Sequence, residues 1–468
     1  MTTASTPSPD RSGTRWARSR TDDVVPLREA TRTWFAISLQ TFGGPAGQIA
    51  VMQHKLVDEK RWLGQRRFLH ALNYCMLLPG PEAQQLAIYT GWLLNGTVGG
   101  LIAGTLFVLP GLVALLALSA AYAGFGDTTL VASLFAGLAP AVIAIVLHAV
   151  QRVGRRALVH PAQVAVAVAS FVALALFAVP FPAVIAAAGL VGWLLSRWVP
   201  ELRTTAGHGT VDGPPPLISD DALHHDRPAA GRTLRVLVVG LVLWAVPVVV
   251  VTTLVGSTPV FREQGLFFSG AAVVTFGGAY AVLSYVAQQA VHVYGWLAPG
   301  EMVRGLALAE TTPGPLIMVV EFVAFLGAYR DPGSLNPWVA AVLASLLVCW
   351  VTFVPCFLFV FLGAPYVERL RENQTLTAAL NGITCAVVGV IANLALFFAL
   401  HTLFDDLRRV HAGPVHLDVP VLSSWDPFAV CLTVFAVFLV FARGTSTVRI
   451  LAVCGAVGLV KALVTTLS

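Results

Sequence analysis

The stretches TFGGPAGQIAVMQ at 41–53 and LPGPEAQQLAIYTGWLLNGTVGG at 78–100 decide the fold, because short motifs within and between them return later in the chain. Three motifs recur at one displacement of 234 residues: TFGG at 41–44 and 275–278, WL at 62–63 and 296–297, and PGP at 79–81 and 313–315. Farther along, a displacement of 245 residues pairs Pro110 with Pro355 and 137–142 with 382–387. Several motifs at a shared displacement indicate an internal duplication. We therefore interpret the chain as two copies of one unit.

The composition indicates a membrane protein. Of 468 residues, 57% are hydrophobic and only 11% are charged, which excludes a soluble protein with a charged surface. Apolar runs long enough to cross a bilayer as helices recur after residue 32. These runs are continuous rather than alternating, so they exclude a β-barrel and predict an all-α polytopic membrane protein with the lipid bilayer as its partner.

The charged residues and cysteines point to no further class of partner. A net charge of +5 would suit nucleic acid, but the basic residues cluster in short segments between apolar runs, where membrane topology places them. The six cysteines lie in apolar segments without a CxxC pair, so we predict no metal site, no disulfide framework and no cofactor.

Hydropathy divides the chain into thirteen apolar segments. We place them at about 33–53, 69–94, 97–123, 129–150, 162–179, 181–198, 234–256, 264–287, 303–329, 335–360, 374–401, 424–442 and 446–465. The predicted units are a disordered cytoplasmic tail at 1–32, a first repeat at 33–198, a cytoplasmic linker at 199–233, an unpaired helix at 234–256 and a second repeat at 257–468. One unpaired helix between two copies of six segments predicts that the copies are inserted with opposite orientation, as in many secondary transporters.

The distribution of charge agrees with this inverted repeat, because cytoplasmic loops carry excess Arg and Lys. Residues 151–160 hold three arginines whereas 121–128 hold only an aspartate, and the counterpart of the latter at 361–373 is basic. We expect a multi-pass protein of a bacterial inner membrane with a cytoplasmic N-terminus and an outside C-terminus. The basic loop at 54–68 would lie outside if 33–53 and 69–94 crossed fully, so re-entrant segments are the alternative.

The FGG and PGP motifs lie within apolar segments, where they should break the helices. A helix that restarts after a break presents unpaired N–H groups with a partial positive charge, so it can bind an anion without a basic side chain. The alternative is that Gly and Pro only kink or closely pack the helices. Both motifs recur in both copies, which favours a shared binding site near the middle of the membrane.

Neutral side chains near the breaks complete the predicted site, because they can hold a tetrahedral oxyanion and release it again. The predicted substrate-binding residues are Gly43, Gly44, Gln48, Gly80, Pro81, Gln84, Gly277, Gly278, Thr311, Thr312, Gly314 and Pro315. Glu82 and Glu310 flank the two PGP motifs and are the candidates for proton coupling, since ionisable groups inside a membrane are costly. A carboxylate favoured by the start of a helix is the alternative interpretation of Glu82.

These motifs resemble those of the chromate ion transporter (CHR) family in its two-domain, long-chain form. The similarity rests on FGGPAGQIAVMQ, the 62–68 stretch, LPGPEAQQLAIYTGWLLNGTVGG, the Leu-Pro pair at 109–110, TFGGAYAVLSYV and TTPGP, and it covers about 33–465. The resemblance implies efflux of chromate, with sulfate as a related substrate, and resistance to chromate. Ala279 departs from the pattern, because the first copy has Pro45 at the equivalent position.

Two other functions compete with this interpretation. One is transport of a different anion or small solute on the same scaffold. The other is an intramembrane enzyme, but HExxH, GxSxG, paired-aspartate and phosphate-loop motifs are absent from the sequence, so we predict that the protein is not an enzyme. Without an ATP-binding motif, secondary transport is expected, and the sequence specifies no oligomeric state.

Overall fold

A computed structural model describes residues 24–42, 44–198, 217, 230–254, 259–276, 278–366, 373–413 and 415–467. Most of the predicted tail and linker lie outside these ranges. The first helix, α1, begins at Leu27, so the prediction of a disordered tail as far as residue 32 was wrong at its end. Trp34 and Ile37 are buried, which shows that the apolar side chains of α1 fix it to the rest of the protein.

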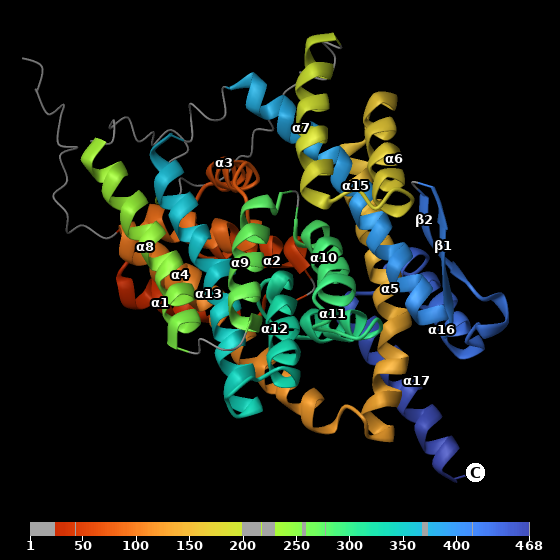
Figure 1. Cartoon of the computed structure of the whole chain (residues 1–468). Coiled ribbons are helices and arrows are strands. Elements are labelled where there is room, and N and C mark those ends of the chain that lie inside the picture. The colour runs from red at the N-terminus through yellow and green to blue at the C-terminus, as the bar shows by residue number, and fades with distance from the viewer. Residues whose placement is uncertain are drawn as a thin grey trace, which may run out of the picture.

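The helices of the two halves follow the same order (Figure 1). The first half contains α1 (Leu27–Ser38), α2 (Gly44–Gln53), the π-helical turn η1 (His54–Glu59), α3 (Gln65–Cys75), α4 (Glu82–Phe125), α5 (Thr129–Ala157), α6 (Pro161–Ala175) and α7 (Phe181–Trp198). After α8 (Ala230–Leu254), the second half contains α9 (Pro259–Val274), α10 (Ala279–Gln288), the π-helical turn η3 (Gln289–Val293), α11 (Glu301–Thr311), the 3₁₀ turn η4 (Leu316–Met318), α12 (Val319–Arg330), α13 (Pro337–Gly363), the 3₁₀ turn η5 (Ala364–Tyr366), α15 (Gln374–Leu403), the 3₁₀ turn η6 (Leu422–Ser424), α16 (Pro427–Phe441) and α17 (Thr447–Leu467). A π-helical turn follows both α2 and α10, which extends the sequence repeat to local structure.

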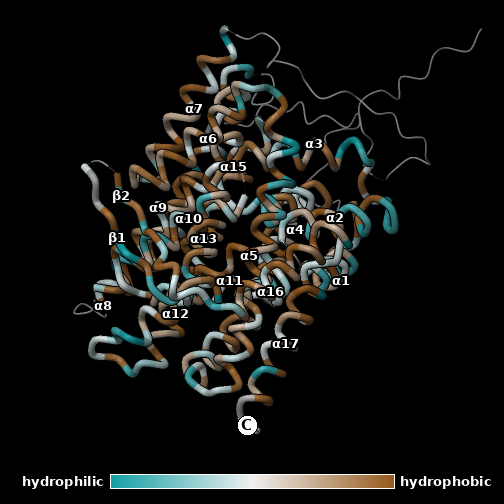
Figure 2. The backbone as a smooth tube through the Cα atoms, turned by 90° about the vertical axis from the view of Figure 1, so that its right-hand side faces the viewer, coloured by the Kyte–Doolittle hydropathy of each residue, from teal (hydrophilic) through white to brown (hydrophobic). Residues whose placement is uncertain are grey.

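Seven helices in the described ranges are long and apolar enough to cross a membrane: α4, α5, α7, α8, α13, α15 and α17. Hydrophobic residues dominate these helices, and hydrophilic residues gather at their ends and in loops (Figure 2). The prediction of an all-α polytopic membrane protein is therefore confirmed.

Four of the predicted apolar segments are each divided into two helices. The segments 33–53, 69–94, 264–287 and 303–329 break at the FGG and PGP motifs, as expected. One predicted boundary differs, because 69–94 and 97–123 join in α4 through a kink at Asn95 and Gly96. Gly96 has a φ of 62° there, a conformation that glycine adopts without steric cost.

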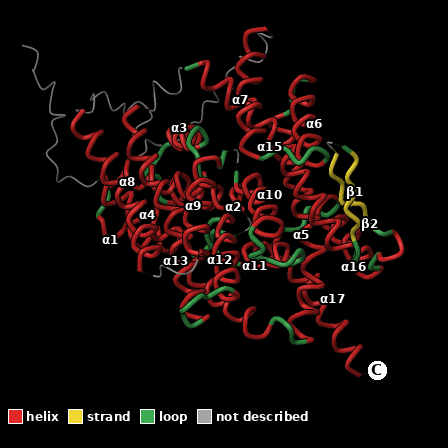
Figure 3. Tube along the Cα trace, in the orientation of Figure 1, coloured by secondary structure: helices red, strands yellow, loops and turns green. Residues whose placement is uncertain are grey.

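A β-hairpin that the sequence analysis did not predict follows α15. Strands β1 (Leu407–Ala412) and β2 (Val415–Pro420) pair in antiparallel register, with Arg409 opposite Asp418 (Figure 3). The backbone N–H of His416 donates to the carbonyl of Leu176 over 2.8 Å, so the hairpin is anchored just beyond α6. Because β1 and β2 replace a short connection, they explain why the loop between α15 and α16 is longer than the loop between α5 and α6.

Glycines allow the spanning helices of the two halves to cross closely. A Cβ on Gly192 of α7 would lie 2.6 Å from Cα of Gly382 on α15, and a Cβ on Gly137 of α5 would lie 3.0 Å from Cα of Gly458 on α17. Small residues at such crossings let helices approach through their backbones in a membrane. Each crossing joins a helix of the first half to a helix of the second, so the two halves pack closely against each other.

Candidate functional site

The four breaks are shaped by glycines in a conformation that other residues rarely adopt. The φ angles are 79° at Gly44, 122° at Gly80, 103° at Gly278 and 98° at Gly314. Glycine enters this left-handed region without the steric cost of a Cβ. Gly43 and Gly277 lie outside the described residues.

Backbone hydrogen bonds bring the breaks of one half against those of the other. The N–H of Gly80 donates to the carbonyl of Thr275 over 2.8 Å, and the N–H of Gly314 donates to the carbonyl of Thr41 over 3.0 Å. In both cases a PGP glycine binds the threonine that begins the TFGG motif of the other copy. The pattern is reciprocal, as contacts between two copies related by a two-fold axis must be.

A second pair of contacts has the same reciprocity. A Cβ on Gly314 would lie 3.4 Å from Cα of Gly111, which follows Pro110 in α4. A Cβ on Gly80 would lie 2.9 Å from Sγ of Cys356, which follows Pro355 in α13. Each PGP turn therefore packs against the proline-containing spanning helix of the opposite half.

These hydrogen bonds change which donors an anion could use. The N–H groups of Gly80 and Gly314 already bind carbonyl oxygens, so they are not free for a ligand. Free donors remain in the first turns of the helices that follow the breaks. The start of α4 and the start of α10 both lack a side-chain cap, which leaves their first N–H groups to another partner.

Tyr280 and Glu310 form a buried pair where three broken helices meet. The hydroxyl of Tyr280, in the first turn of α10, donates to Oε1 of Glu310, near the end of α11, over 2.5 Å. The same hydroxyl lies 3.8 Å from the Cβ position of Gly44, where α2 begins. Oε2 of Glu310 is buried without a hydrogen-bond partner.

The predicted glutamines lie at the breaks with different hydrogen bonding. Gln48 is buried and its Nε2 donates to the carbonyl of Gly314 over 2.6 Å, which ties α2 to the second PGP turn. Gln85 donates to the carbonyl of Pro79 over 2.6 Å, so its amide stabilises the first PGP turn. Both amide atoms of Gln84 are buried and have no hydrogen-bond partner among the described residues. Gln84 is therefore the predicted polar side chain with an amide still available to a ligand.

Thr311 and Thr312 lie next to the second PGP turn, but their hydroxyls are engaged. Thr311 donates to the carbonyl of Leu308 over 2.8 Å, and Thr312 donates to the carbonyl of Ala309 over 3.1 Å. A hydroxyl has one proton, so neither can donate to an anion without first giving up this bond. In this conformation both hydroxyls bind carbonyl oxygens in the last turn of α11.

The two carboxyl candidates lie in different surroundings. Glu82 begins α4 and is half-buried, and no hydrogen bond joins it to another of the described residues. Glu310 is buried and bound by Tyr280. The sequence analysis missed Tyr280, although a signal existed in the alignment of the copies, where Tyr280 stands opposite Ala46.

Arg304 lies in another polar cluster. Its guanidinium donates to the hydroxyl of Tyr122 over 2.9 Å, and that hydroxyl donates to Glu301 over 3.0 Å. Glu301 also forms an ion pair with Arg330 over 2.6 Å. This cluster joins the end of α4 to α11 and α12, and its contacts include none of the four break glycines.

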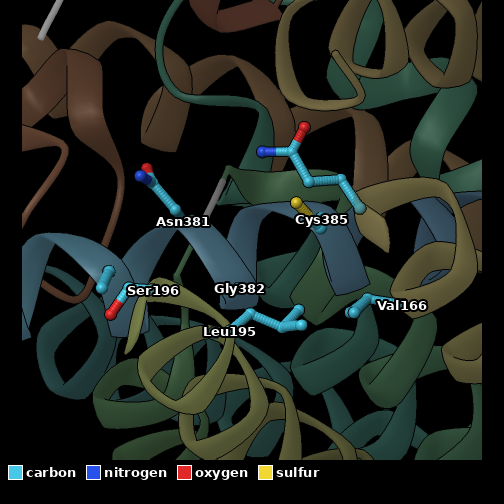
Figure 4. A pocket seen from close by; sticks show the side chains of 9 residues that line it. Val166, Leu195, Ser196, Asn381, Gly382 and Cys385 are labelled. Carbon is cyan, nitrogen blue, oxygen red and sulfur yellow. The ribbon is translucent and has the colours of Figure 1, made fainter. Parts of the chain in front are cut away.

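A small pocket elsewhere holds none of the predicted site residues (Figure 4). It lies between α6, α7 and α15, where Leu195 and Ser196 face Asn381 and Cys385. The close approach of Gly192 and Gly382 forms part of its wall. The pocket belongs to the helix crossing rather than to the breaks.

Comparison with known proteins gives a match along both halves. The sequence model of the family described as chromate transporter matches residues 28–193 and 262–459. The chromate transport protein of Pseudomonas aeruginosa is 32% identical over 387 residues, covering 80% of this chain and 82% of that protein. The chromate transport protein of Cupriavidus metallidurans is 27% identical over 394 residues, covering 82% and 86%.

A shorter relative matches a segment of this chain that is shorter than either of its two halves. An uncharacterized transporter of Bacillus subtilis is 31% identical over 122 residues, covering 26% of this chain and 61% of that protein. That relative is therefore less than half as long as this chain, which fits a structural unit the size of one copy. No solved structure matches the chain.

Proposed function

From the premise that this chain belongs to the chromate transporter family, we propose that it is a secondary transporter that moves chromate out of the cell. The observation that carries the proposal is the reciprocal joining of four helix breaks, one FGG and one PGP from each half. Broken helices whose N-termini point to a common midplane site are the means by which inverted-repeat transporters bind anionic groups. Export would confer resistance to chromate.

Helix lengths support re-entrant pairs. The helices α1, α2 and α3 have 12, 10 and 11 residues. At about 1.5 Å per residue they reach only about half of a hydrocarbon core that is about 30 Å thick. In the proposed topology, α1/α2 and α3 with the part of α4 before the kink at Asn95 enter and leave on the cytoplasmic face, and the rest of α4 crosses the membrane. The pairs α9/α10 and α11/α12 enter and leave from outside. This arrangement puts the basic 54–68 loop and the N-terminus in the cytoplasm and the C-terminus outside.

The anion would be held by the first turns of α2, α4 and α10 together with the amide of Gln84. These groups are neutral donors near helix N-termini, which favour negative charge through the helix dipole. A tetrahedral oxyanion such as chromate or sulfate has acceptor oxygens on every side and no proton to donate when fully ionised. Binding without a fixed cation leaves the affinity low enough for release.

Glu310 is the proposed proton carrier. It is buried at the join of α2, α10 and α11, with one oxygen bound by Tyr280 and the other without a partner. A carboxylate next to an anion site would repel the substrate, so proton binding at Glu310 and anion binding are coupled electrostatically. Glu82 at the first break is the alternative carrier.

Purified protein in liposomes tests the proposal. We expect labelled chromate to exchange across the membrane, and unlabelled sulfate to compete more strongly than molybdate or phosphate. Competition by a different oxyanion with little effect of chromate would favour another anion transporter on the same scaffold. Absence of chromate flux from correctly inserted protein would contradict the proposed function.

A further inference from the structure

A third buried glutamate, Glu321 on α12, has no part in the proposed anion site. Its side chain is fully buried, and neither carboxyl oxygen has a hydrogen-bond partner in the part of the chain that the structure describes. Within the described ranges, no Lys, Arg or His forms an ion pair with it. An isolated carboxylate in a membrane interior is costly, so a proton held on the carboxyl is the means of keeping this group neutral.

The neighbours of Glu321 on α13 are polar but uncharged. The hydroxyl of Ser345 lies 3.4 Å from the backbone oxygen of Glu321. Cys349 lies one turn farther along α13 and is also buried. Thr352 continues the row at helical spacing, and its buried hydroxyl has no partner.

The helices α4, α9 and α11 also pack against α12. From α9, the neutral amide of Gln264 donates to the carbonyl of Ala324, one turn from Glu321. From α11, Glu310 is bound by Tyr280 and the guanidinium of Arg304 donates to Tyr122, a residue of α4. In the described part of the chain, Glu310 and Arg304 therefore have hydrogen-bond partners other than Glu321.

The equivalent helix pair of the first half shows that this carboxyl is not required for packing. The displacements of 234 and 245 residues place Ala87, Gly100 and Gly104 opposite Glu321, Ser345 and Cys349. A Cβ on Gly100 would lie 3.0 Å from the carbonyl oxygen of Ile88, so the two parts of α4 meet through bare backbone. At this contact the first half has only small residues, whereas the second half has the carboxyl of Glu321.

Met318 connects Glu321 to the second PGP break. Its Cε lies 3.4 Å from the Cβ position of Gly111, which packs on Gly314, and its Sδ lies 3.7 Å from Sγ of Cys349. Met318 and Glu321 are three residues apart, so they lie on the same side of the helix. Met318, whose side chain is unbranched and flexible, therefore contacts both the helix packed on the break and the α13 side of Glu321.

We propose that Glu321 is a second proton site of the transport cycle, separate from the Tyr280–Glu310 pair and connected to the second break through Met318. The inference rests on the proposed function, because a proton site has a role only if anion movement is coupled to protons. Movement of α12 relative to α13 would expose the carboxyl through the row of Ser345, Cys349 and Thr352.

The full-length protein in liposomes loaded with a pH-sensitive dye tests this site. We would measure protons moved per chromate for the wild type, Glu321→Gln and Glu321→Asp. The ratio should fall by about half in Glu321→Gln while chromate exchange persists, and Glu321→Asp should retain it because a carboxyl remains. An unchanged ratio in Glu321→Gln, with the wild type coupled, would overturn the second site and leave the proposed function intact.

A chemical measurement on the wild type covers the case in which Glu321→Gln fails to insert. A hydrophobic carbodiimide reacts with protonated carboxyls in apolar surroundings, and peptide mass spectrometry locates the product. We expect modification of Glu321 that decreases as pH rises, and absence of modification would contradict the proposal. Chromate flux without proton movement in the wild type would overturn this inference and the coupling, whereas absence of any flux would overturn the proposed function itself.

Discussion

The two copies of the break region share a backbone and differ in their side chains. Gly80 and Gly314 adopt the same left-handed conformation and bind the threonine carbonyl of the opposite copy. Tyr280 and Glu310, by contrast, stand opposite Ala46 and Met76 in the first copy. The difference teaches that duplication supplies a symmetric frame of backbone turns, and that the hydrogen-bonded Tyr280–Glu310 pair occurs in the second copy alone.

The PGP glycines, which the two copies share, should be the residues least tolerant of substitution, and equally so in each copy. Replacing Gly80 or Gly314 by leucine puts a side chain at a φ of 122° or 98° and, at Gly80, brings Cβ within 2.9 Å of Cys356. A strain of about 1–3 kcal/mol, together with a blocked break, should lower chromate flux by at least about a hundredfold in either variant.

Gly270→Leu is the matched control, because a Cβ at Gly270 of α9 would meet nothing within 4 Å. Flux into liposomes and the amount of inserted protein are the measurements. Normal chromate flux in either Gly80→Leu or Gly314→Leu would show that the two copies do not play equivalent roles.

Substitutions in the Tyr280–Glu310 pair, which only the second copy has, should affect proton coupling rather than chromate binding. In Glu310→Gln the carboxyl can no longer change its charge, so accumulation driven by a pH gradient should be lost while chromate exchange remains. Tyr280→Phe removes the hydrogen bond to Oε1 and retains the carboxyl, so we expect it to keep coupling with a shifted pH dependence. Unaltered pH dependence in a well-inserted Glu310→Gln would exclude this residue as the carrier.

A smaller effect is expected at Gln84. Its amide is buried without a protein partner, so Gln84→Ala should remove one hydrogen bond to the anion. Such a bond contributes about 1–3 kcal/mol, which would raise the apparent KM for chromate about five- to a hundredfold. Gln85→Ala is the comparison, since that amide binds the carbonyl of Pro79 and should act on protein stability instead. An unchanged KM in Gln84→Ala would remove this side chain from the site.

The smallest effect is expected at Thr312. Its hydroxyl donates to the carbonyl of Ala309, so Thr312→Val should change the KM less than about threefold, even though the residue adjoins the second PGP turn. The measurement is the concentration dependence of chromate flux beside that of Gln84→Ala. A loss of affinity equal to that of Gln84→Ala would mean that the hydroxyl turns toward the anion during transport.

The sequence predicted the fold wherever a local rule applied. Apolar length identified the spanning helices, and the FGG and PGP motifs identified the four breaks because Gly and Pro interrupt a helix by their own geometry. The hairpin at 407–420 was missed, since its short charged strands resemble a loop in hydropathy. The start of α1 was missed for a related reason, because its polar first turn lacks the apolar run of a spanning helix.

The sequence predicted which residues lie at the breaks, but it did not predict the hydrogen bonds that they form. The sequence placed Gln48, Gln84 and Glu310 near the breaks, but a hydrogen bond between Gly80 and Thr275 depends on how two distant segments meet. For the same reason we expected free N–H groups at the break glycines, whereas Gly80 and Gly314 use their N–H groups in hydrogen bonds between the copies. Tyr280 required a residue-by-residue comparison of the two copies, because its role depends on Glu310 lying across from it.

Opposite insertion of the two copies is the central claim, and labelling of single cysteines in intact cells tests it most directly. Asp127, between α4 and α5, and Asn373, just before α15, are exposed and occupy equivalent places in the two copies. With the native cysteines replaced, a membrane-impermeant thiol reagent should label a cysteine at 127 from outside and label one at 373 only after the cells are opened. Labelling of both positions from the same side would contradict the account.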